Sequence, residues 1–345
     1  MSHSMMWGKR VSDPIFTKID ISSASVKYLG STFSPSDGNI YAANNQFNSA
    51  LRIDTSDETG LSVPTEGRNY NFPNVAPNGD IYLSAYGNLG NRQFAKSTPP
   101  GDFLEVGTVM DSSTLKFAGL VLAPNGKLYT VPQNYGFVQE IDPATDTVVD
   151  KAAVAGGTNK FRGGVLAENG FIYFIPRSSS VFGKYNPVTD TYTTHSAPSG
   201  ANKYAGGTVA LNGKIYCVPQ SANHVLKIDP DTDTFTTIPL GAIPTNYYTG
   251  QLAPNGKIYC PSLSTVNVLV IDPSTDTVEV FDNTFGSMNH TCSSLAPNGK
   301  IYMAPQSQDY VLIIDNIGDA IPSDFVIPAM VDLAASRYNK FHNKA

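Results

Sequence analysis

The sequence predicts an all-β fold, a seven-bladed β-propeller built from four-stranded antiparallel blades. The first observation is a short motif that occurs seven times in the 345 residues. It consists of Asn-Gly or a similar pair, one variable residue, Ile or Leu, and then Tyr. The second is the spacing of the copies, 41 to 47 residues, which is the period of four-stranded propeller blades rather than of helical repeats. The glycines that mark the copies are Gly38, Gly79, Gly126, Gly170, Gly213, Gly256 and Gly299.

Each copy holds four strand segments. Apolar or alternating runs are separated by Asn-Gly, Asp-Pro and Thr-Asp-Thr, which form turns. In the copy marked by Gly213 we expect strands at about 205–211, 214–219, 224–229 and 235–240. The first strand of a copy is rich in small residues, such as Gly163-Gly164, which suits an inner strand crowded around a central axis.

The N-terminal strand material is expected to close the ring. Residues 15–21 read like the third strand of a copy and residues 26–30 like the fourth, yet no first and second strands precede them. We expect them to complete the last blade, which residues 292–316 begin, because closure removes an exposed sheet edge. The predicted organisation is an N-terminal arm at 1–14, the propeller at 15–317, and a C-terminal strand and tail at 318–345.

The text of the copies also carries a family resemblance. Asn-Gly-Lys-Ile-Tyr, a polar loop, and then Val-Leu-Lys-Ile-Asp-Pro-x-Thr-Asp-Thr stand most clearly at 212–235, 255–278 and 125–148. This pattern resembles the YVTN type of seven-bladed propeller repeat, a relative of the NHL and PQQ-like propellers, over roughly residues 15–316. The resemblance implies the fold but not one function, because such propellers include surface-layer and adhesive proteins as well as enzyme domains.

Composition narrows the class of partner. The net charge of −6 offers no basic footprint for nucleic acid. We expect no membrane insertion and a chain made in a cytoplasm, because neither a secretory signal nor 18 consecutive apolar residues are found. Cys217, Cys260 and Cys292 are interpreted as buried free thiols rather than as a disulfide framework. No cofactor is predicted.

Two sets of residues are expected where the inner strands begin. Alternate residues of a strand point to opposite sides, so we expect one set to pack between the blades and the other to be exposed at the mouth of the channel. The set expected to pack, nine residues before each marker glycine, is Leu29, Tyr70, Phe117, Phe161, Tyr204, Tyr247 and His290. The set expected to be exposed, one residue earlier, is Tyr28, Asn69, Lys116, Lys160, Lys203, Asn246 and Asn289.

Cationic and amide side chains near this mouth predict a ligand site. Such donors suit carbohydrate hydroxyls, carboxylates or a protein partner, and with aromatic platforms nearby the predicted ligand class is an acidic glycan of a cell surface. The predicted ligand-binding residues are Lys116, Lys160, Arg162, Arg177, Lys203, Asn246 and Asn289.

No catalytic set is predicted from the sequence. His290 is the candidate general base, with a packing histidine as the alternative interpretation. Carboxylates do not converge as a hard-cation site requires, so no metal site is predicted. Motifs of the Ser/His/Asp or Cys/His kind are also absent from the sequence.

The ends of the chain suggest docking to protein partners. Trp7 lies in an apolar N-terminal arm, and Tyr338 and Phe341 lie in a basic, aromatic tail. We therefore interpret the chain as a non-catalytic interaction or attachment module, a structural or receptor- and glycan-binding component of a phage-like virion or other surface assembly. The alternatives are a lyase- or lactonase-like propeller enzyme with its site at the channel mouth and, for localisation, the cytoplasm.

Overall fold

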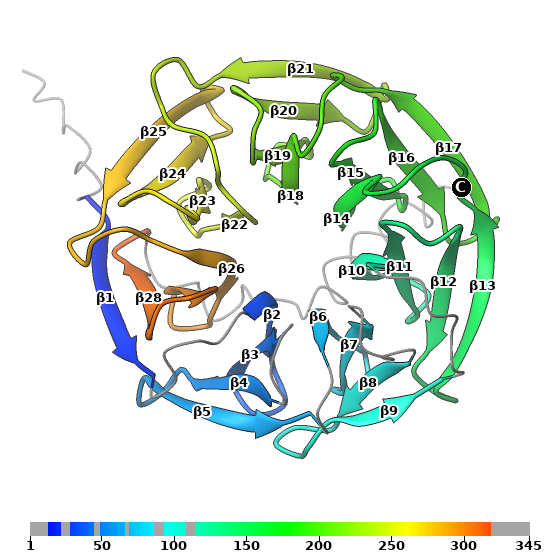
Figure 1. Cartoon of the computed structure of the whole chain (residues 1–345), viewed down its shortest axis with the longest axis horizontal. Helices are drawn as coiled ribbons and strands as arrows, with labels where there is room; N and C mark the ends of the chain where they lie inside the picture. The colour runs from blue at the N-terminus through cyan, green and yellow to red at the C-terminus, as the bar shows by residue number, and fades with distance from the viewer. Residues whose placement is uncertain are drawn as a thin grey trace, which may run out of the picture.

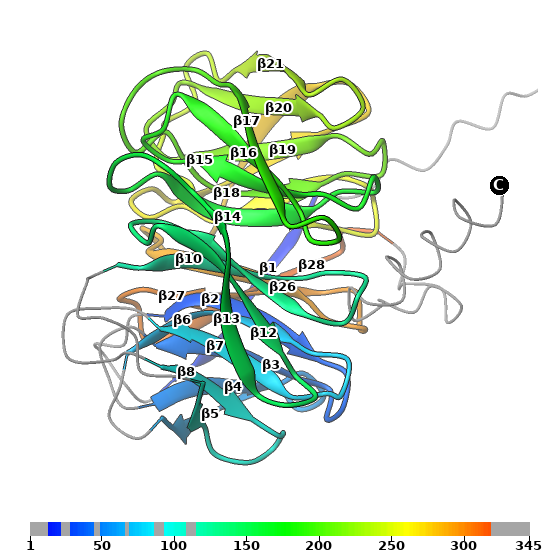
Figure 2. The same cartoon turned by 90° about the vertical axis from the view of Figure 1, so that its right-hand side faces the viewer.

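The computed structural model describes residues 13–21, 28–44, 49–65, 69–85, 93–107 and 115–318. These residues form seven four-stranded antiparallel sheets arranged as a ring around a central axis (Figure 1). Figure 2, turned by 90°, shows the ring from the side. The described part of the chain contains no helix that is long and apolar enough to cross a membrane. The seven four-stranded antiparallel sheets confirm the predicted fold class.

The strands follow one another from the axis to the rim in each blade. Blades 1 and 2 consist of β2 (Tyr28–Ser34), β3 (Asn39–Asn44), β4 (Ser49–Asp54), β5 (Thr59–Pro64), β6 (Tyr70–Val75), β7 (Ile81–Ala85), β8 (Phe94–Ser97) and β9 (Leu104–Val106). Blades 3 and 4 consist of β10 (Phe117–Leu122), β11 (Leu128–Pro132), β12 (Phe137–Asp142), β13 (Thr147–Ala153), β14 (Phe161–Leu166), β15 (Ile172–Pro176), β16 (Val181–Asn186) and β17 (Thr191–Ser196). Blades 5 and 6 consist of β18 (Tyr204–Val209), β19 (Ile215–Pro219), β20 (His224–Asp229), β21 (Thr234–Pro239), β22 (Gln251–Leu252), β23 (Ile258–Cys260), β24 (Asn267–Asp272) and β25 (Thr277–Asp282). Blade 7 consists of β26 (His290–Leu295), β27 (Ile301–Pro305), β28 (Tyr310–Asp315) and β1 (Ile15–Asp20).

The ring closes through its first strand, as predicted. β1 pairs antiparallel with β28, with Ile15 opposite Asp315 and Asp20 opposite Tyr310. The order of the N-terminal strands differs from the expectation, because β1 is a fourth strand and β2 is the first strand of blade 1. The physical reason is that blade 7 supplies only three strands from the C-terminal side, which leaves one open edge on the rim for β1.

The core is a ring of seven interfaces between neighbouring sheets. Each of seven buried apolar clusters draws its residues from two adjacent blades. The tyrosine three residues after each marker glycine is buried in one of these clusters. Cys217, Cys260 and Cys292 are buried free thiols, as predicted, and burial raises the pKa of Cys292 to about 11.

The inner strands contain a bulge that brings them close together around the axis. The pairing of β14 with β15 shifts between Phe161 and Gly164, and Gly163 has a φ of 78°. A Cβ atom added at Gly163 would lie 2.9 Å from the Cα atom of Gly206 in the next blade. Glycine is therefore required here both for the left-handed backbone and for the close approach of two backbones.

The propeller has two ends, which we name by the connections that they carry. The turn end holds the Asn-Gly hairpins between first and second strands and the turns between third and fourth strands. The loop end holds the loops between second and third strands and the connections from one blade to the next. The predicted docking residues Trp7, Tyr338 and Phe341 lie outside the described residues.

Candidate functional site

At the loop end, the aromatic set packs between the blades as expected. The residues at this ring position are all buried. In blade 1 the position belongs to Tyr28 rather than Leu29, because Tyr28 pairs with Asn44 as Tyr70 pairs with Ala85. The sequence count was wrong by one residue there because the turn before Gly38 is one residue longer than the other turns.

The expected exposure of the lysines is wrong. Lys116, Lys160 and Lys203 are buried. The Nζ of Lys160 donates to the carbonyl of Tyr135 at 2.8 Å, and the Nζ of Lys203 donates to the carbonyl of Ser179 at 2.7 Å. Burial lowers the pKa of both side chains. These ammonium groups tie a blade to a loop of the preceding blade, which explains lysine at this position.

The other predicted ligand residues of this group are partly buried and hold local contacts. Asn246 donates to Ser264 Oγ at 3.0 Å, and Asn289 donates to Ser307 Oγ at 2.6 Å. Nη1 of Arg177 donates to Asn159 Oδ1 at 3.1 Å. Ligand binding by this set stays a prediction.

His290 occupies the ring position of blade 7 and has no exposed surface. Its Nε2 lies 3.2 Å from the carbonyl oxygen of Tyr310, and its ring packs against the Tyr310 ring with centroids 5.2 Å apart. Burial lowers the pKa of His290 to about 4, so the imidazole is neutral at pH 7. This is the packing interpretation rather than that of an accessible general base.

The residue after the ring position lies at the axis. Leu29, Ala205 and Tyr248 form one buried cluster although they come from blades 1, 5 and 6, so they meet across the channel. We call this layer the axial plug. Its seven members are all buried: Leu29, Asn71, Ala118, Arg162, Ala205, Tyr248 and Thr291.

An axial cavity of about 140 Å³ begins one residue further along the inner strands. All seven blades line it, largely with the glycines of the bulges. The residues that line it include Ser31, Thr249, Cys292 and Ser293. Glycine is needed at several of these positions because an added Cβ atom would meet the inner strand of the neighbouring blade, as Gly163 would meet Gly206.

Arg162 of the axial plug is buried without a counter-ion. Only 7% of the residue is exposed, and its ζ carbon lies 4.4 Å from the centre of the Tyr248 ring. Within the described ranges, its guanidinium makes no hydrogen bond and no ion pair. A guanidinium held over an aromatic ring without a hydrogen-bond acceptor keeps its five N–H donors available to bind.

Asn71 holds the same position in blade 2 and is a site residue that sequence reasoning missed. The residue is 0% exposed, and neither its Oδ1 nor its Nδ2 has a hydrogen-bond partner. The available signal was positional, because Asn71 and Arg162 both stand eight residues before a marker glycine. Among the described residues no group of three or more His, Cys, Asp and Glu is placed to hold a metal ion.

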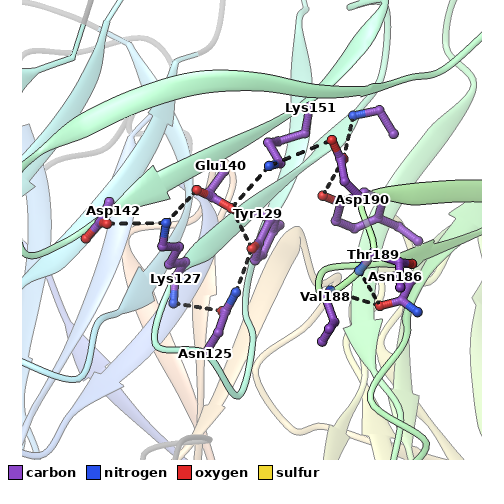
Figure 3. A network of polar contacts seen from close by, with 12 residues as sticks. Asn125, Lys127, Tyr129, Glu140, Asp142, Lys151, Asn186, Val188, Thr189 and Asp190 are labelled. Atoms are coloured by element: carbon purple, nitrogen blue, oxygen red, sulfur yellow. Dashed lines mark hydrogen bonds and ion pairs between the residues drawn. The ribbon is translucent and has the colours of Figure 1, made fainter.

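The polar groups of the turn end, by contrast, are engaged with one another. Around Tyr129 a network joins blade 3 to blade 4 (Figure 3). The carboxylate of Glu140 accepts from Tyr129 Oη and from Lys127 Nζ, each at 2.7 Å. The Nζ of Lys151 lies 3.9 Å from Oε2 of Glu140 and 3.7 Å from Oδ2 of Asp190 in the next blade.

The same arrangement repeats around the ring. Tyr173 Oη donates to Asp233 of the next blade at 2.8 Å, and Lys184 Nζ donates to that carboxylate at 2.6 Å. Tyr216 donates likewise to Asp276 at 2.8 Å. These contacts explain the tyrosines that follow Gly170 and Gly213, and they give the turn end a structural role.

No family model and no curated protein matches the sequence. Solved structures do match. A streptogramin B lyase structure aligns with a TM-score of 0.75 at 15% identity, covering 88% of this chain and 97% of that chain. A catalytically inactive histidine variant of virginiamycin B lyase from Staphylococcus aureus with quinupristin aligns at 0.74 and 14% identity, covering 88% and 99%. The extracellular domain of a hybrid two-component system from B. thetaiotaomicron aligns at 0.70 and 14% identity, covering 91% of this chain and 42% of that chain.

These comparisons establish a seven-bladed propeller fold of the streptogramin B lyase kind. They contradict the interpretation of the chain as a non-catalytic attachment module of a virion, because two of the three propellers described are lyases. The virion role finds no support among them. The prediction of an attachment module was wrong because the turn-end repeats stabilise the fold. Such repeats do not distinguish an attachment protein from an enzyme.

Proposed function

We propose that this chain is an enzyme of the lyase type whose substrate binds at the loop-end mouth of the axial channel, on a propeller of divergent YVTN-type repeats. The observation that carries the proposal is a set of loop-end side chains with polar groups that lack hydrogen-bond partners. Arg162, a buried residue, makes no hydrogen bond, and the buried atoms without a partner include the side-chain amide of Asn71, Oε1 of Gln220 and Oδ1 of Asn289. The enzymes that share the fold support the same class.

Unsatisfied groups of this kind are costly. Leaving a buried donor or acceptor without a partner costs about 1–3 kcal/mol, and more when the group is charged. Chains retain such groups where a ligand supplies the missing partners, and departures from local consistency are typical of functional sites. A substrate that brings oxygen atoms to this mouth would satisfy them.

Arg162 provides the electrophilic part of the chemistry. Elimination or ester cleavage places developing negative charge on an oxygen atom of the substrate. A guanidinium on a largely buried residue, already held over the Tyr248 ring, stabilises that charge with little reorganisation at the moment of reaction. Removing one such preorganised donor typically lowers kcat by about 10²–10³-fold.

The test is turnover of a defined panel of substrates. Quinupristin and a set of cyclic esters are incubated with the protein and followed by liquid chromatography and mass spectrometry. Ring opening by elimination leaves the mass unchanged, whereas hydrolysis adds the mass of one water. We expect a ring-opened product of unchanged mass with the wild type, and its loss in the Arg162→Met variant.

The matched control is Lys18→Met. Lys18 is also a cation over a tyrosine ring, that of Tyr310, but it is paired with Asp20 at 2.6 Å and lies on the rim strand β1, outside the axial plug. We expect this variant to keep at least half of the activity. A panel on which the wild type makes no product, or an Arg162→Met variant as active as the wild type, would overturn the proposal.

A further inference from the structure

We infer that Arg162 and Asn71 form a carboxylate-binding site at the loop-end mouth of the axial cavity. The inference rests on the proposed function, because it names the group by which the substrate is anchored at that site. Three independent features carry it: an unpaired guanidinium, an unpaired amide at the equivalent position, and a cavity lined by the residues that follow both in the sequence.

The guanidinium requires an anion. Arg162 is more than nine-tenths buried, and no carboxylate of the described residues accepts a hydrogen bond from it. A buried cation without a counter-ion is destabilising, and this penalty disappears when an anion binds. Lys184 at the turn end shows the usual solution, because its ammonium is paired with Asp233 at 2.6 Å.

The way Arg162 is held selects a planar anion. Its ζ carbon lies 4.4 Å from the centre of the Tyr248 ring, so the ring of a residue two blades away covers one side of the guanidinium. The N–H donors that point away from the ring are then left to bind. A fixed guanidinium edge matches the two oxygens of a carboxylate in a bidentate pair, which adds geometric selectivity to the charge.

Asn71 supplies the second donor. It stands two blades before Arg162 in the axial plug, and the residue between them in the ring is Ala118. Because an alanine side chain ends at Cβ, the buried Ala118 places no long side chain between the two polar groups. The unbonded Nδ2 of Asn71 suits an oxygen of the bound group, and its unbonded Oδ1 suits a hydroxyl or amide next to that group.

The cavity limits the size of the group attached to the carboxylate. It begins at Gly163 and Phe72, the residues next to Arg162 and Asn71, and measures about 140 Å³. An apolar cavity of roughly 150 Å³ holds a molecule the size of benzene. Glycine backbone and a few hydroxyls line the space here, so we expect a small acid with a flat or compact body, such as benzoate.

The experiment measures binding of benzoate, acetate and inorganic phosphate to the full chain by calorimetry and by the shift of the Tm. The variants are Arg162→Met and Asn71→Leu, which remove the polar groups, with Lys18→Met as the control, because Lys18 also lies over a tyrosine ring but is paired with Asp20 at 2.6 Å. We expect benzoate to bind the wild type more tightly than phosphate, Arg162→Met to lose at least tenfold in affinity, and Asn71→Leu to lose about threefold. Lys18→Met should bind as the wild type does.

A second readout keeps the test independent of folding. In buffer free of carboxylates, Arg162→Met should have a Tm equal to or above that of the wild type, because it removes an unpaired buried charge. A lower Tm together with unchanged benzoate affinity would show a structural arginine and overturn the inference, as would tighter binding of phosphate than of benzoate or no binding of any carboxylate.

The outcomes also separate this inference from the proposed function. Benzoate binding that depends on Arg162, in a protein with no turnover, would support the site and contradict the enzyme. Turnover that benzoate does not inhibit, with no direct binding of benzoate, would support the enzyme and contradict the carboxylate site.

Discussion

The two ends of this propeller treat their polar side chains in opposite ways. At the turn end, the repeated tyrosines, aspartates and lysines bond to one another across the blade interfaces, as around Asp233. At the loop end, the axial plug buries Arg162 and Asn71, whose side chains have no hydrogen-bond or ion-pair partner among the described residues. The comparison teaches that the regular part of the sequence builds the ring, and that its departures from regularity mark the site.

The largest loss of stability is expected from a substitution where the inner strands of two blades approach each other closely. Gly163→Ala places a Cβ atom 2.9 Å from the backbone of Gly206 at a φ of 78°, so both overpacking and backbone strain oppose it. We expect the free energy of unfolding to fall by about 3–4 kcal/mol in urea titrations. Gly157→Ala, also at positive φ but with open space around it, should lose only about 1 kcal/mol. Equal losses would contradict the crowding at the axis.

The next effect breaks the turn end. Asp233→Ala removes the acceptor of Lys184 and one of the two acceptors of Tyr173, and the side chain of Lys184 is only 14% exposed. We expect the free energy of unfolding to fall by about 2–3 kcal/mol. Asp231→Ala in the same turn removes a carboxylate that is 80% exposed and should change it by less than about 0.5 kcal/mol. Two similar values would show that the network does not hold the blades together.

His290 sharpens the distinction between packing and function. His290→Ala leaves a cavity between two blades, so we expect a loss of about 2 kcal/mol in unfolding free energy. His290→Phe restores the aromatic residue found at this position in other blades and removes a buried nitrogen without a partner, so its stability should lie within about 1 kcal/mol of the wild type. A large loss in the phenylalanine variant would indicate that the imidazole itself is needed.

The smallest effect is the acid sensitivity of the turn end. Burial opposes ionisation of Asp233, but hydrogen bonds from Lys184 and Tyr173 outweigh it and hold its pKa below the ordinary value of 3.8. Because the folded pKa is depressed, the stabilisation is present above about pH 4, the unfolded value, and is lost as the pH falls through the folded pKa. Urea unfolding at pH 5 and pH 3 should show a smaller loss in Asp233→Ala than in the wild type. An identical loss would exclude this carboxylate as a source of acid sensitivity.

Much of the fold was predictable from the sequence because each blade repeats the same turn motif. The seven marker glycines predict the number of blades, and the burial of the tyrosines after them explains why the repeat is so regular. The burial of Lys160 was not predictable from strand alternation alone. The direction of its side chain depends on carbonyl groups of the preceding blade, which are distant in the sequence.

The candidate site was predicted only in part. Arg162 was among the predicted ligand residues, whereas Asn71 was not, because the bulge of the inner strand places a third set of residues at the axis. Strand alternation allows two faces, and a bulge re-aims side chains outside that pattern. The absence of partners around Arg162 is a property of the folded ring, so no local pattern reports it.

The measurement that tests the central claim most directly is a crystal structure of the full chain grown with benzoate. The account predicts a carboxylate bound to the guanidinium edge of Arg162 and within hydrogen-bond distance of Asn71, with the benzoate ring in the axial cavity. A structure in which a side chain of the protein pairs with Arg162 and the axial cavity holds no benzoate would contradict it.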